Sequence, residues 1–187
     1  MKNIFKTSGF LIATIGITLV LGGCFGSGTA TTKLKTFDNP EFTLQIDPTW
    51  IILSKSEFET EVPKETLAAF TAPEATDGFF SNVTVTKEDL KQEVSSLDYA
   101  RANINKAGQL LTQYKKLQEV KIDAAPLKTL VHVFEAQLNP TEKPLRYAQM
   151  YITKGTWGYI VTGATLPDST KELQSAVNGM VASFRVK

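Results

Sequence analysis

Residues 127–138 (LKTLVHVFEAQL) and 157–165 (WGYIVTGAT) decide the fold of this chain. In an extended strand, successive side chains point to opposite faces, and both faces of these two stretches are apolar. In 127–138, Leu127, Val131 and Val133 would point one way and Leu130, Phe134, Ala136 and Leu138 the other. In 157–165, Trp157, Tyr159 and Val161 would oppose Ile160 and Ala164. Strands of this kind need cover on both sides, which helices can supply. The sequence therefore predicts an α+β fold, an α/β/α sandwich around a largely antiparallel sheet.

The remaining elements follow from hydrophobic period and turn residues. Apolar residues recur every three or four positions over 97–114, where Ser96 can cap the start, and again in a final helix that begins at Asp168 or Ser169. Further strands are predicted at 41–46, 50–53, 66–72, 79–87, 117–122 and 144–154. Asp77-Gly78 supplies turn chemistry for a hairpin of the third and fourth of these strands. Trp50 is expected to be largely buried.

The N-terminal segment has the pattern of an export signal. Lys2 and Lys6 precede a 12-residue apolar stretch, 10–21, which is shorter than the roughly 20 residues that span a bilayer as a helix. Residues 24–36 are rich in Gly, Ser and Thr, a composition typical of a flexible tether. We therefore expect a signal peptide at 1–23, a tether at 24–36 and one globular domain at 37–187.

The residues Leu21-Gly22-Gly23-Cys24 resemble the lipobox of bacterial lipoproteins. That resemblance implies cleavage before Cys24 and attachment of acyl chains such as palmitate to it. The chain would then be extracytoplasmic and anchored by lipid to a bacterial membrane. An ordinary signal peptide, or an uncleaved anchor with a chance cysteine, is the alternative.

Composition limits the partners. The chain of 187 residues has 20 Lys and Arg against 19 Asp and Glu, and removal of residues 1–23 would change its net charge from +1 to −1. A protein that neutralises many phosphates needs an excess of basic residues, so nucleic acid is not an expected partner. Cys24 is the only cysteine, which excludes an internal disulfide.

Residues that could carry chemistry are few. His132 is the only histidine, and neither a phosphate-binding loop nor a metal-ligand motif accompanies it. We therefore expect no catalytic residues, no metal site and no cofactor. Two alternatives stay open: a hydrolase built from common residues such as Asp47, His132 and Glu135, and a small-ligand carrier with a cavity between sheet and helix.

The stretch Phe42 to Trp50, with its Pro48-Thr49-Trp50 turn, resembles the opening strand of PsbP-like proteins. This group includes PsbP of photosystem II and bacterial lipoproteins. Asn82-Val-Thr-Val85 ahead of a long helix, and a closing helix that ends Val181-Ala-Ser-Phe184, are also similar to the group. The resemblance implies its fold and a non-enzymatic binding or accessory role, here toward an envelope protein or membrane complex.

Acidic residues gather in two connections that antiparallel strands would bring to one end of the sheet. Residues 55–65 and 87–95 hold seven carboxylates against four lysines: Glu57, Glu59, Glu61, Glu65, Glu88, Asp89 and Glu93. We expect this acidic end to meet a basic protein surface or to hold a divalent cation weakly. The alternative is a solvated rim without a partner.

Overall fold

The computed structural model describes residues 34–58, 65–124 and 127–187. The expected signal peptide, Cys24 and the tether as far as residue 33 lie outside the described residues. So do Glu59 and Glu61 of the acidic end.

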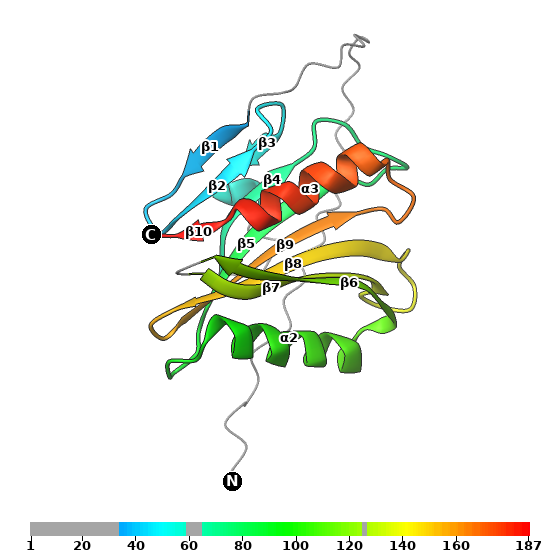
Figure 1. The fold of residues 1–187 in the computed structure, drawn as a ribbon. Coiled ribbons are helices and arrows are strands. Elements are labelled where there is room, and N and C mark those ends of the chain that lie inside the picture. The colour runs from blue at the N-terminus through cyan, green and yellow to red at the C-terminus, as the bar shows by residue number, and fades with distance from the viewer. Residues whose placement is uncertain (1–33, 59–64, 125–126) are drawn as a thin grey trace.

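A seven-stranded sheet forms the centre of the molecule (Figure 1). Its strand order is β3-β4-β5-β9-β8-β7-β6, and every neighbouring pair is antiparallel. The strands are β3 (Ile51–Leu53), β4 (Thr66–Thr71), β5 (Asn82–Asp89), β6 (Thr112–Ala124), β7 (Leu127–Gln137), β8 (Leu145–Lys154) and β9 (Trp157–Thr165). The pairing of β4 with β5 confirms the predicted hairpin. A four-residue helix that the sequence did not predict, α1 (Lys55–Phe58), follows β3.

A second, three-stranded sheet joins the two ends of the described chain. It pairs β1 (Lys35–Asp38) and β10 (Arg185–Val186) with opposite edges of β2 (Phe42–Ile46). β1 begins inside the segment predicted as tether, two residues before the expected start of the domain. The sequence did not reveal β1 or β10, because both are short and largely exposed and therefore carry no apolar alternation.

Helix α3 (Lys171–Ser183) and the small sheet cover one face of the large sheet, with the main core between them. The N-cap of α3 is Thr170, two residues after Asp168, which was predicted as one possible start of this helix. Val177 and Val181 approach β9 at Gly163, where an added Cβ would lie 2.3 Å from a Val177 methyl group. Trp50 is 7% exposed and belongs to this core, which confirms its predicted burial.

Helix α2 (Ser96–Leu110) packs against β6, β7 and β8 on the opposite face (Figure 1). Ser95, rather than the predicted Ser96, accepts the capping hydrogen bond, from the Asp98 N–H. The predicted end at residue 114 was wrong: Leu111 caps the helix, Gln113 has a positive φ of 51°, and Tyr114 already lies in β6. Tyr114 continues the apolar spacing, so period alone could not locate the break.

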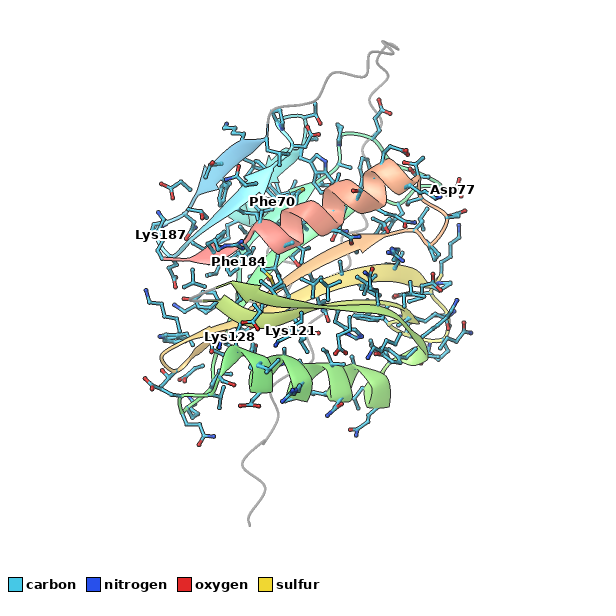
Figure 2. All side chains as sticks on the ribbon, viewed as in Figure 1. Phe70, Asp77, Lys121, Lys128, Phe184 and Lys187 are labelled. Carbon is cyan, nitrogen blue, oxygen red and sulfur yellow. The ribbon has the colours of Figure 1, made fainter. Side chains whose placement is uncertain are left out.

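The two apolar faces of the central strands pack as predicted. Val131, Val133 and Val161 belong to the core beneath α3, whereas Leu130 and Ile160 pack with residues of α2. The interior is filled by side chains from every layer (Figure 2). The α/β/α arrangement is therefore confirmed, with the small sheet as an addition. None of the described helices is long and apolar enough to cross a membrane.

Candidate binding surface

The structure brings five of the predicted acidic residues to one end of the large sheet. Since β3, β4 and β5 are successive antiparallel neighbours, the connections after β3 and after β5 leave at the same end. The Lys87 N–H donates to the Glu65 carbonyl at 3.0 Å, and the Leu90 N–H donates to the Thr156 carbonyl at 2.8 Å. These bonds fasten Glu65 and the 88–95 connection beside each other and to the turn between β8 and β9. We call the region of Glu57, Glu65, Glu88, Asp89 and Glu93 the acidic end.

Three of these carboxylates have structural hydrogen bonds. Glu57 accepts from the Ser54 N–H at 2.6 Å, and its hydrogen bonds with Ser54 lower its pKa. Asp89 binds Lys91, whose ammonium lowers the Asp89 pKa. Glu88 accepts the Tyr99 hydroxyl, which joins α2 to β5. Glu65 and Glu93 are exposed and form no salt bridge within the described ranges.

Basic side chains lie beside the acidic end. Lys87 binds Glu41, and Glu41 also accepts the Tyr159 hydroxyl at 2.9 Å. The Lys87 hydrogen bond lowers the Glu41 pKa. Lys187 binds Asp38, while the Lys154 ammonium donates to the Lys187 carbonyl (Figure 2 labels Lys187). This end of the sheet therefore carries ion pairs as well as Glu65 and Glu93, which form no salt bridge within the described ranges.

Trp157 is the exposed aromatic at this end. At strand spacing, the aromatics Trp50, Trp157, Tyr147, Tyr151 and Tyr159 could stack on a ligand, but their pattern favours core positions. Trp157 is instead 42% exposed, whereas the other four are buried. It is the first residue of β9, next to the turn, where alternation no longer reports burial.

The residues of the hydrolase alternative do not come together. His132 is fully buried, its Nε2 lies 2.8 Å from the Tyr114 hydroxyl, and burial lowers its pKa to about 4. Glu135 lies an odd number of residues along the same strand, so it occupies the opposite face, where it pairs with Lys115 at 3.4 Å. Asp47 accepts from Thr49 in the turn after β2. The three side chains therefore have separate surroundings.

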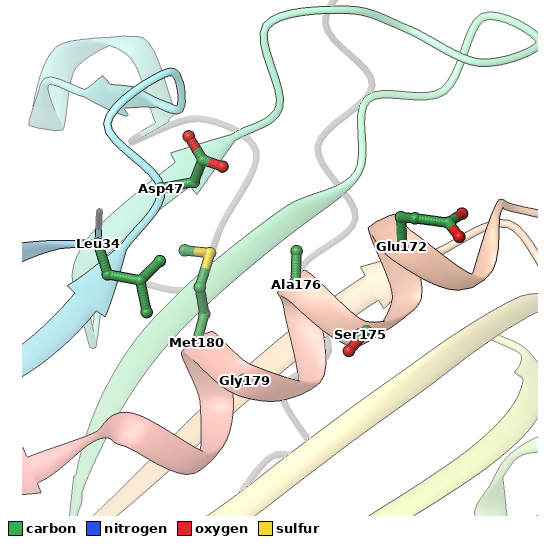
Figure 3. Close-up of a pocket in the computed structure, with 7 residues that line it drawn as sticks. All are labelled: Leu34, Asp47, Glu172, Ser175, Ala176, Gly179 and Met180. Atoms are coloured by element: carbon green, nitrogen blue, oxygen red, sulfur yellow. The ribbon is translucent and has the colours of Figure 1, made fainter. Parts of the chain in front are cut away.

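A groove of about 290 Å³ lies between α3 and the small sheet (Figure 3). Leu34 faces Ala176 and Met180 across it, with Asp47 and Glu172 among its other lining residues. Like the cavity that the carrier alternative requires, this groove lies between a helix and a sheet. The described part of the chain contains no group of three or more His, Cys, Asp or Glu side chains that could hold a metal ion.

The comparisons with known proteins concern the fold. No protein-family model and no curated protein matches the chain. Among solved structures, the chain is similar to cyanobacterial PsbP (CyanoP) from Synechocystis sp. PCC 6803, with 14% identity, a TM-score of 0.55, and coverage of 89% of this chain and 99% of that chain.

Two further solved structures are similar to the chain. The Ran-binding protein Mog1p of Saccharomyces cerevisiae has 13% identity and a TM-score of 0.59, with 83% and 96% of the two chains covered. LpqN of Mycobacterium tuberculosis, described as involved in cell envelope biogenesis, has 9% identity and a TM-score of 0.57, with 83% and 91% covered. The chain therefore has the fold that PsbP-like proteins, Mog1 and LpqN share.

Proposed function

We propose that this protein is a lipid-anchored, extracytoplasmic module that binds an envelope or membrane protein and has no catalytic activity. The acidic end carries the proposal: carboxylates from separate connections are held at one end of a rigid sheet by backbone hydrogen bonds. Loops fixed by a rigid scaffold are where binding residues concentrate. Ran binding by Mog1p and the involvement of LpqN in cell envelope biogenesis agree with such a role.

Anchoring depends on Cys24, so Cys24→Ser should release a folded protein from membranes. All residues of the described core lie beyond Cys24 in the sequence. The measurement is fractionation followed by a salt wash, with the melting temperature of the released protein as the control for folding. Recovery of the variant in washed membranes would contradict lipid anchoring.

Binding should depend on Glu65 and Glu93, which form no salt bridge within the described ranges, and on Glu59 and Glu61, which lie outside those ranges. We would replace Glu59, Glu61, Glu65 and Glu93 with Gln together and leave Glu57, Glu88 and Asp89 intact, because these three hold the local structure. The control replaces two exposed carboxylates that lie elsewhere, Glu74 and Glu172, with Gln.

The readout is cross-linking of the lipidated protein in its native membrane at low and at physiological salt. The acidic-end variant should lose its principal cross-linked partner, and the salt dependence of the wild-type cross-link should disappear with it. Equal recovery by the variant, the control and the wild type would reject the acidic end as the binding surface.

A further inference from the structure

Trp157 is the one aromatic among the large hydrophobic side chains that stand exposed in the described part of the chain. It lies directly opposite Asp89 in the β5–β9 ladder and opposite Lys154 in the β8–β9 ladder. Directly opposed residues of an antiparallel pair have Cβ atoms about 5 Å apart. The indole is therefore a neighbour of the acidic end and not a separate patch.

The indole is held in place. The Lys87 ammonium lies 4.2 Å from the Trp157 ring centroid and 5.7 Å from that of Tyr159. Glu41 binds the same ammonium and neutralises it. The next residue, Gly158, is packed so closely under Tyr99 that an added Cβ would lie 2.7 Å from the Tyr99 ring. A side chain that is already ordered loses little conformational entropy when a partner binds.

We infer that Trp157 is the central contact of the acidic end and receives an arginine side chain from a basic segment of a partner protein. A guanidinium stacks on an indole face and pairs with carboxylates in the same plane. Glu93, next to the β8–β9 turn, supplies such a carboxylate. This inference rests on the proposed function and names the contact and the partner chemistry within it.

Charge favours a basic protein segment over an anionic membrane. Lys87, Lys91 and Lys187 are each paired with a carboxylate of this chain, and the Lys154 ammonium donates to the Lys187 carbonyl. Glu65 and Glu93 are exposed and form no salt bridge among the described residues. Unpaired carboxylates repel anionic headgroups and attract cationic side chains. In a typical protein–protein hot spot, the partner buries an aromatic side chain within a polar rim.

The test uses octa-arginine as the probe and the full mature chain without its lipid, Cys24→Ser. The protein has two tryptophans, and Trp50 is buried, so Trp50→Phe isolates the emission of Trp157. Octa-arginine should change that emission saturably. By calorimetry, Trp157→Ala should weaken binding about tenfold, whereas Leu110→Ala, an exposed apolar control on α2, should leave it unchanged.

Each outcome separates this inference from the proposed function. If Trp157→Ala binds octa-arginine as the wild type does while the Gln variant of the acidic end does not, the inference fails and the acidic surface stands. If neither variant changes the affinity, both fail. Binding of octa-lysine with the same dependence on Trp157 and the same affinity would overturn the preference for a guanidinium. Saturable quenching by anionic vesicles instead of octa-arginine would overturn the protein partner.

Discussion

His132 is a fully buried base whose Nδ1 atom has no hydrogen-bond partner among the described residues. Its Nε2 is hydrogen-bonded to the Tyr114 hydroxyl, and its ring stacks on Phe134 with 4.6 Å between the ring centroids. Lys116 and Glu119 on β6 are the charged groups that act on it, with opposite signs. Burial, which disfavours the imidazolium, therefore dominates and lowers the pKa to about 4.

This depressed pKa predicts a loss of stability in mild acid. An unfolded chain protonates His132 near pH 6.5, whereas the folded chain does so only near 4. The unfolded state thus binds more protons between these values, so the free energy of unfolding should fall as pH falls from about 6.5 to 4, by roughly 2 to 3 kcal/mol.

Urea titrations at a series of pH values test this, with His132→Gln as the variant. His132→Gln should flatten the pH dependence in that window, and Tyr114→Phe, which keeps the imidazole, should retain it. Parallel curves for His132→Gln and the wild type would show that another group titrates.

At the scale of elements, α3 packs closely against β9 at Gly163. An added Cβ at Gly163 would lie 2.3 Å from Val177 Cγ1 and 3.1 Å from Val181 Cγ2. Both valines are β-branched and cannot swing aside within a helix. Gly163→Ala should therefore displace α3 and cost about 1 to 3 kcal/mol of stability.

The same helix offers a matched control for that substitution. Gly179 has open space where its Cβ would stand, so Gly179→Ala should be neutral or stabilise α3 by up to about 1 kcal/mol. Chemical denaturation of both variants separates the two expectations. Equal effects at the two positions would contradict close packing at Gly163.

At the scale of the whole molecule, Phe184 joins the last helix to both sheets. It is fully buried and caps α3, and its ring centroid lies 5.1 Å from that of Phe42 in β2 and 6.0 Å from that of Tyr159 in β9. Phe184→Ala should cost about 3 to 5 kcal/mol through cavity formation.

Because the Phe184 side chain packs against both sheets, Phe184→Ala should lower the midpoint of a single unfolding transition. The small sheet should not unfold separately. Near-ultraviolet and far-ultraviolet circular dichroism should report the same midpoint for Phe184→Ala. Phe184→Leu, which keeps most of the apolar volume, should lose less. Two separate midpoints would show that the small sheet unfolds independently.

The residues themselves determined the order of the main strands and helices and the need for cover on both faces of the sheet. These features are local: Val131 and Val133 alternate with Leu130 and Phe134 along a single strand, so the pattern can be read without knowing any neighbour. The carboxylates were visible for the same reason, and antiparallel strand order was enough to bring Glu65, Glu88, Asp89 and Glu93 to one end.

Only the tertiary structure decided the features that join distant parts of the chain. β1 and β10 are too short to show a period and exist because they pair with β2. The exposure of Trp157, and its contact with Lys87 on β5, depend on where a turn ends and which strand lies opposite. The fixed ion pair of Lys87 with Glu41 likewise unites residues far apart in sequence. Pairing energies of this kind come from contacts between segments, which the composition of either segment alone does not encode.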